Sequence, residues 1–182
     1  MTTYVALLYS IVLPAGRRLQ MADLRAVALG LGLRDPSTIG ATGNLIFESE
    51  NGSARDLEIK FEAAFAERFS KSVPIIIRGA AAWRRLVRAN PFSAEAAIDP
   101  AKVAVRVMRS AIPKSVQTAM TRYVDDERIA VVGGDLWIHF MGDPAKSRLI
   151  SALNAGRLEG IGTFRNANTV GKISEALLRK PQ

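Results

Sequence analysis

The sequence contains no cysteine and only one histidine, His139. Without cysteine, the chain cannot form disulfides, thiol nucleophiles or thiolate metal sites, and it is compatible with a reducing compartment. A single histidine also excludes a histidine-based metal cluster and a mechanism that needs two imidazoles. We therefore expect no metal site and no cofactor.

Long apolar runs are missing as well, since none approaches the roughly 20 residues of a membrane helix. The apolar run at residues 4–13 has no basic residue before it, and Arg17 and Arg18 follow it, which is the reverse of a secretory signal. We expect a cytoplasmic protein with no membrane partner, and we take a monomer as the default state.

Positive charge is abundant in the 182 residues, which carry a net charge of +8 and a sequence pI near 10.3. The excess is spread over both halves of the chain. A basic surface favours a phosphate-bearing partner, either a small molecule or nucleic acid. The alternative is a soluble, arginine-rich protein with no such partner.

The first half of the chain has the pattern strand, helix, strand, strand, helix, strand. Gly43-Asn44 is predicted to join two short strands in a hairpin, and Ser53 with Asp56 is predicted to cap the next helix. The predicted strands cover residues 4–13, 38–41, 45–48 and 73–77, and the helices cover 21–31 and the residues after Ser53. A further helix at residues 78–92 precedes a predicted linker at 93–100.

The second half repeats this order. Residues 103–108 alternate as a half-buried strand, and Gly133-Gly134 forms the clearest hairpin, with Val131 opposite Leu136 and Ile129 opposite Ile138. Further elements are predicted after Pro113, after Asp143-Pro144, at 160–163 and over the C-terminal helix. The fold class is therefore α+β: two tandem ferredoxin-like (α/β-plait, βαββαβ) subdomains, 1–92 and 101–182, each followed by an extra helix.

Several segments resemble a known family. They read YVALL at 4–8, MADLRAVALGLG at 21–32, TGNLIFES at 42–49, ANPF at 89–92, WIHF at 137–140, SRL at 147–149 and T-x-RN-x-NTV at 163–170. In these segments the chain resembles the uncharacterised bacterial family catalogued as domain of unknown function 1697. The resemblance implies two α/β-plait subdomains and no particular activity.

The chain departs from the family pattern in two places. The family usually has Arg-Gly and a glycine-rich loop after the first strand, where this chain has Tyr9-Ser10 and then Pro14-Ala15-Gly16. The tryptophan usual in the C-terminal motif is Ala167 here. A family site built on those groups would therefore be altered in this chain.

The segment at 163–170, which we call the C-terminal motif, contains several polar side chains at the predicted start of a helix. Asn168 or Thr169 is expected to cap the helix, so that its free N–H groups, together with Arg165 and Asn166, form an anion pocket. The alternative is structural: the amides cap the helix and satisfy the loop, and Arg165 pairs with a carboxylate across the interface between the two subdomains.

Other candidates are basic or aromatic. Arg17 and Arg18 lie in a loop between a strand and a helix, and Asn44 lies in a turn. An arginine stripe on the helix at 78–92 could contact nucleic-acid phosphates, although such stripes are usually only solvated. Its members are Arg78, Arg84, Arg85 and Arg88.

Trp137 and His139 share one face of a predicted strand, where RNA-recognition plaits stack bases. The sequence lacks the aromatic signature of those domains, and the same face could instead be buried. A lone histidine on a strand is more often structural than catalytic.

The leading hypothesis is a binding module for a phosphate-bearing ligand, with nucleic acid as one option, in the cleft between the two subdomains. An enzyme acting on a small phosphorylated or nucleotide substrate is the alternative, although no catalytic set can be assembled from the sequence. A degenerate member with a structural role is the third reading.

Overall fold

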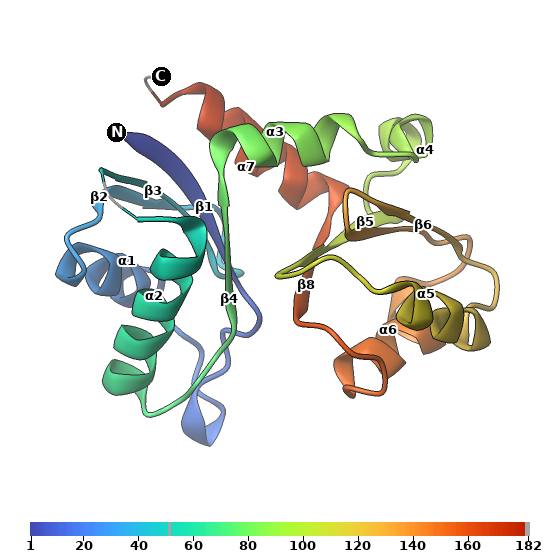
Figure 1. Cartoon of the computed structure of the whole chain (residues 1–182), viewed down its shortest axis with the longest axis horizontal. Coiled ribbons are helices and arrows are strands. Elements are labelled where there is room, and N and C mark those ends of the chain that lie inside the picture. The colour runs from blue at the N-terminus through green and yellow to red at the C-terminus, as the bar shows by residue number, and fades with distance from the viewer. Residues whose placement is uncertain (51, 181–182) are drawn as a thin grey trace. The chain divides into compact units, whose positions relative to one another are not determined.

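The computed structural model describes residues 1–50 and 52–180, and the chain divides into two units (Figure 1). Unit 1 comprises Met1–Arg85 and Gly171–Gln182, and unit 2 comprises Leu86–Val170. Each unit contains one four-stranded antiparallel sheet with the strand order of a ferredoxin-like plait. The predicted fold class is therefore confirmed. The division differs from the predicted boundaries, because the last residues of the chain group with the first unit.

The sheet of unit 1 has the order β2-β3-β1-β4. Its elements are β1 (Thr2–Leu8), α1 (Met21–Gly30), β2 (Arg34–Thr38), β3 (Asn44–Ser49), α2 (Ala54–Phe69) and β4 (Ile75–Gly79). The core lies between one sheet face and the two helices, where Leu24 of α1 and Phe61 of α2 pack in one cluster with Ala6 and Phe47. Ser53 and Asp56 form the predicted capping box at the start of α2.

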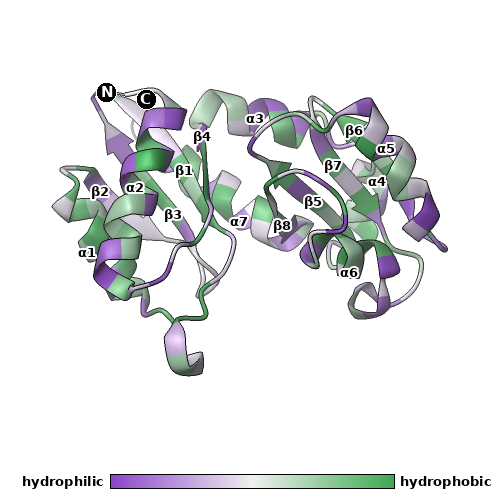
Figure 2. Cartoon of the chain, turned by 60° about the horizontal axis from the view of Figure 1, so that its bottom comes forward, coloured by the Kyte–Doolittle hydropathy of each residue, from purple (hydrophilic) through white to green (hydrophobic). Residues whose placement is uncertain are grey.

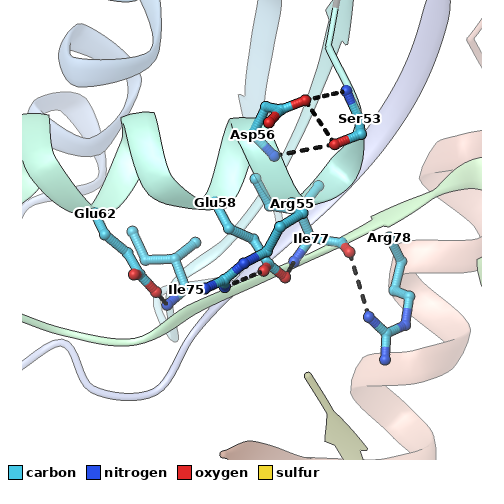
Figure 3. A network of polar contacts seen from close by, with 8 residues as sticks. All are labelled: Ser53, Arg55, Asp56, Glu58, Glu62, Ile75, Ile77 and Arg78. Carbon is cyan, nitrogen blue, oxygen red and sulfur yellow. Dashed lines mark hydrogen bonds and ion pairs between the residues drawn. The ribbon is translucent and has the colours of Figure 1, made fainter. Parts of the chain in front are cut away.

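The edge strand β4 is bound by two carboxylates of α2, which the sequence did not reveal. Glu62 accepts a hydrogen bond from the N–H of Ile75 at 2.8 Å, and buried Glu58 accepts one from the N–H of Ile77 at 2.9 Å (Figure 3). The two glutamates are one helical turn apart, so they match alternate residues of the strand. This pairing covers donors that an edge strand would otherwise expose.

The predicted strand at 4–13 is too long. β1 ends at Leu8, and the following residues form a small hairpin in which Val12 bridges Arg18 and the N–H of Leu13 donates to the carbonyl of Arg17 at 2.6 Å. Pro14–Gly16 forms the single 3-10 turn at its tip. Strand β4 likewise begins at Ile75, two residues later than predicted.

The predicted two-residue hairpin at Gly43-Asn44 is wrong. Strand β2 ends at Thr38, four residues earlier in the chain than a tight turn requires, and Asn44 is the first residue of β3. Gly43 has φ +73, and a Cβ there would lie 2.8 Å from Cγ2 of Ile11 and 2.9 Å from Cβ of Leu8. The turn therefore packs on the end of β1 instead of closing directly on itself.

The predicted linker at 93–100 contains a helix. After α3 (Ala80–Arg88), the side chain of Asn90 accepts from the N–H of Phe92, and α4 (Ser93–Ile98) follows. Glu95 of α4 pairs with Arg128, whose guanidinium lies 5.1 Å from the ring centroid of Phe92. These contacts attach α4 to the sheet of unit 2, a tertiary effect that local composition did not indicate.

The sheet of unit 2 has the order β6-β7-β5-β8. The hairpin prediction is confirmed, with Val131 opposite Leu136 and Ile129 opposite Ile138. Gly134 has φ +91 and approaches Ala111 so closely that a Cβ would lie 2.8 Å from the alanine Cβ. The elements are β5 (Val103–Met108), α5 (Lys114–Met120), β6 (Arg128–Val132), β7 (Asp135–His139), α6 (Arg148–Asn154) and β8 (Gly162–Asn166), followed by α7 (Ala167–Leu178).

Strand β5 is buried on both faces, so the prediction of a half-buried strand is wrong. Ala104 and Met108 belong to the cluster under α5 and α6, and the valines that alternate with them are buried as well. The strand is central in the sheet, between β7 and β8. Figure 2 shows hydrophobic residues along the strands and mixed bands along the helices. Within the described part of the chain, no helix has the length and apolarity needed to cross a membrane.

Candidate anion-binding site

The C-terminal motif lies across the end of β8 and the start of α7. The helix begins at Ala167, so the predicted cap at Asn168 or Thr169 is wrong. Asn166 precedes the helix, and its Oδ1 accepts a hydrogen bond from the N–H of Thr169 at 3.0 Å. Asn168 and Thr169 are residues of the first helical turn. The amide of Asn166 is therefore used in capping.

Arg165 is a buried residue of β8, with 8% of its surface exposed. Its Nη1 donates to Thr163 Oγ1 at 2.9 Å and to the carbonyl of Phe164 at 2.7 Å. Burial lowers the pKa of this guanidinium to about 10. These two bonds go to acceptors on its own strand, so they fit the structural alternative for the motif better than an anion pocket.

Arg17, Arg18 and Asn44 lie at one end of the unit 1 sheet, where β1 ends and β3 begins. Both arginines are exposed, whereas Asn44 is only 1% exposed. The Nδ2 of Asn44 donates to the carbonyl of Ile39 at 3.0 Å and to Thr42 Oγ1 at 2.9 Å. Asn44 thus stabilises the turn before β3.

Trp137 is 1% exposed and does not present its ring to solvent. His139 is half-buried, and its ring centroid lies 6.0 Å from that of Phe92. Trp137 and His139 therefore do not form an exposed aromatic surface on which bases could stack.

The arginine stripe is divided between two elements. Arg78 belongs to β4, where its Nη1 lies 3.4 Å from the carbonyl of Ile77. Arg84, Arg85 and Arg88 belong to α3, and the last two are exposed. Trp83 on the same helix is fully buried, and its Nε1 donates to Ser174 Oγ at 3.1 Å.

A cavity of about 280 Å³ lies in unit 1 at the start of α3. Arg84 and Lys180 contribute its two cationic side chains, and among the residues that the structure describes no carboxylate lines it. Lys180 is held in place by the side chain and carbonyl of Asp35, and its own side chain is 12% exposed. The remaining lining residues are Met1, Thr2, Thr3, Gly79, Ala80, Ala81 and Leu177.

The first turn of α3 contributes to the electrostatics of this cavity. Residues 79–82 read Gly-Ala-Ala-Ala, so they carry no side-chain acceptor, and the turn contains no acidic residue. N–H groups at a helix start carry partial positive charge and favour anions. Two cations and a helix start therefore share one concave surface. The sequence indicated Arg84 but not Lys180, which lies near the other end of the chain.

Two other cavities differ in charge. One of about 270 Å³ in unit 1 contains the Arg34–Glu50 ion pair beside Lys60. The other, of about 280 Å³ in unit 2, is acidic, with Asp125, Asp126, Glu127 and Asp143 in its lining. Over the residues described, no group of three or more histidine, aspartate or glutamate side chains could hold a metal ion. The cavity at α3 is thus the one of these three suited to an anion.

Comparisons with known proteins support the fold and the family. A solved structure described as that of a conserved bacterial protein, SP0830, from Streptococcus pneumoniae is similar, with 21% identity and a TM-score of 0.77 over 98% of this chain and 99% of that chain. At this identity, the likeness concerns the fold. No curated protein matches the chain. The family model described as "Protein of unknown function (DUF1697)" matches residues 1–137, most of the chain but not its C-terminal motif. The chain therefore belongs to the DUF1697 family.

Proposed function

We propose that this protein is a cytoplasmic binding module for a phosphate-bearing ligand, and that Arg84 and Lys180 hold the phosphate. The observation that carries the proposal is the cavity at the start of α3, where both side chains meet a helix start and, within the described part of the chain, no carboxylate belongs to the lining. The guanidinium of Arg84 can bind two phosphate oxygens at once, and Lys180 supplies a compact charge.

The size of the cavity favours a small ligand. At about 280 Å³ it is slightly smaller than most ligand pockets, which span roughly 300–1,000 Å³. A phosphate with one small attached group fits that volume better than an extended dinucleotide does. The net charge of +8 would also steer anions towards the protein.

The lining favours binding over catalysis. Its described residues include the hydroxyl groups of Thr2 and Thr3 but no carboxylate or imidazole that could transfer a proton. An enzyme acting on a small phosphorylated or nucleotide substrate would need such a group from elsewhere. Arg165 and Asn166, which the sequence suggested for an anion pocket, make local hydrogen bonds.

The test is calorimetric titration of the protein with inorganic phosphate and with a nucleoside monophosphate at low ionic strength. Arg84→Gln and Lys180→Gln should each weaken binding about tenfold or more, because hydrogen bonds to charged groups contribute roughly 1.5–3 kcal/mol. Arg122→Gln, an exposed arginine of unit 2, removes the same charge and should leave the affinity almost unchanged.

Asp35→Asn is a second control. It removes the carboxylate that pairs with Lys180 but keeps the lysine, so phosphate binding should be retained or become tighter. Undetectable binding of both ligands at low salt would contradict the proposal. Equal affinity of the wild type and the Arg84→Gln, Lys180→Gln double variant would contradict it as well.

A further inference from the structure

A second basic surface lies in unit 1, at the end of the sheet where β1 ends and β4 begins. We call it the hairpin surface and define it by Tyr9, Val12, Arg17, Arg18 and Lys71. Figure 1 shows its hairpin as a blue loop that projects beyond the strands. The α3 cavity involves Thr2 and Thr3 at the opposite end of β1, about 20 Å away along the strand.

The segments of this surface are joined by hydrogen bonds. The two arms of the hairpin are paired through the N–H of Leu19 and the carbonyl of Ile11 at 2.8 Å. The ammonium group of Lys71 donates to the carbonyl of Val12, and the N–H of Tyr9 donates to the carbonyl of Pro74 at 3.0 Å. These hydrogen bonds hold the segments of the hairpin surface together.

Its charge is of one sign. Residues 9–20, 39–44 and 70–74 meet at this end of the sheet, and these segments contain no aspartate or glutamate. They contain Arg17 and Arg18, both exposed, and half-buried Lys71. Three cations without a neighbouring acid in sequence form a patch that attracts polyanions.

The hairpin surface also carries an aromatic side chain. Tyr9 is 40% exposed, beside Val12 at 47%. Proteins that bind single strands combine backbone-tracking cations with aromatic rings on which bases stack. This combination is found here on a loop and not on the sheet face that such plaits usually use.

We propose that the hairpin surface binds single-stranded nucleic acid, with Tyr9 stacking on a base and Arg17 and Arg18 contacting phosphates. The proposal is independent of phosphate binding at α3, because it uses different residues. An anionic membrane is the competing partner for a basic loop. The surface has only Tyr9 and Val12 as exposed large apolar side chains, too little apolar area for stable insertion into a bilayer.

The test is fluorescence anisotropy of the full chain with a labelled mixed-sequence single-stranded DNA and an RNA of equal length. Tyr9→Ala should weaken binding roughly 5- to 150-fold, the range measured for loss of one stacked base, and Tyr9→Phe should retain binding. Arg17→Gln with Arg18→Gln should lower the slope of log affinity against log salt by about 1.4.

Matched controls separate charge from position. Arg122→Gln with Arg157→Gln removes two exposed arginines of unit 2, and the affinity and salt slope should stay close to wild type. Arg84→Gln with Lys180→Gln should remove phosphate binding at α3 and leave the oligonucleotide affinity nearly unchanged. The two proposals can therefore fail separately.

Three results would overturn the inference. The first is no oligonucleotide binding in about 50 mM salt, where phosphate contacts are strong. The second is equal binding by Tyr9→Ala and wild type. The third is binding of phosphatidylserine vesicles that requires Tyr9 and both arginines while oligonucleotides fail to compete. Thermal unfolding of each variant should match the wild type, which shows that any loss is local.

Discussion

Glu127 shows how unit 2 accommodates a buried carboxylate. Only 7% of the residue is exposed, and its side chain accepts hydrogen bonds from the hydroxyl of Ser147 and from the N–H of Asp125 at 2.9 Å. Burial by itself raises the pKa of Glu127. Hydrogen bonds from Ser147 and from the backbone of Asp125 and Glu127, together with the charge of Arg148, outweigh this effect, so the pKa lies below its usual value. Ser147 also caps α6 by accepting from the N–H of Ile150, and the carboxylate therefore orients a helix cap.

Because the pKa of Glu127 is lowered in the folded state, we expect part of the unfolding free energy to be lost in acid. Because the pKa of Glu127 is lower in the folded state, the unfolded chain binds more protons between the two pKa values. The stabilisation is present above the unfolded pKa of about 4.5 and is lost as the pH falls through the folded value. The difference in unfolding free energy between wild type and Glu127→Gln should therefore shrink between about pH 6 and pH 3.

Urea denaturation at a series of pH values measures this difference. Glu67→Gln, which neutralises an exposed carboxylate of α2, should give no comparable trend. A Glu127→Gln difference that is constant over the whole pH range would show that the carboxylate has the same pKa in the folded and unfolded chain.

At the scale of elements, the contact between α2 and β4 stabilises the edge of unit 1. The carboxylates of Glu58 and Glu62 bind the N–H groups of Ile77 and Ile75, and Arg55 pairs with Glu58 at 3.1 Å. In unit 2, the helix at the corresponding place in the plait is α6, with the sequence RLISALN and no acidic residue. The two plaits therefore differ in how a helix supports the outer strand.

Glu62→Ala should loosen β4 selectively. The substitution leaves the N–H of Ile75 without the carboxylate, and an unsatisfied buried donor costs about 1–3 kcal/mol. Amide hydrogen exchange of Ile75 and its strand should accelerate, while exchange in β5 and β7 should not change. Glu62→Gln keeps an acceptor and should show a smaller effect. Equal protection of β4 in wild type and Glu62→Ala would contradict this role.

The elements that the sequence predicted best are those fixed by local chemistry. Gly133-Gly134 has two residues that both adopt positive φ, as a tight hairpin requires, and its register followed from that turn. Gly43 also has positive φ, but it meets Leu8 and Ile11, which are distant in sequence. Helix α4 is likewise bound through Glu95 to Arg128, which lies 33 residues further along the chain. The spacing of apolar residues along the chain gives no information about contacts between residues that are distant in sequence.

The candidate site was difficult to predict for a similar reason, because sequence alone does not show what a polar side chain contacts. The motif around Arg165 is rich in polar groups, but its amide and guanidinium bind backbone and side chains within three residues. Sequence spacing cannot distinguish a group that binds its neighbours from one directed at a ligand. Arg84 was a candidate, whereas Lys180 could be found only once the fold placed α7 in unit 1.

At the scale of the whole molecule, unit 1 is built from both ends of the chain. Gly171–Gln182 groups with Met1–Arg85, although the whole of unit 2 separates them in sequence. Trp83 is fully buried and donates to Ser174, and Ile173 and Leu177 of α7 are buried as well. The C-terminal part of α7 therefore completes a domain that began at the N-terminus.

A chain that ends at Val170 should consequently lose stability in unit 1 and not in the sheet of unit 2. Burial of Ile173 and Leu177 contributes roughly 1.5–3 kcal/mol each, so the loss should amount to several kcal/mol. Hydrogen exchange followed by mass spectrometry should show reduced protection in β1 and β4, with β5 and β7 unchanged. Leu178→Ala, which shortens an exposed side chain of the same helix, should match the wild type. Equal loss of protection in both sheets would mean that the two units unfold together, and full protection of β1 and β4 would mean that unit 1 folds without α7.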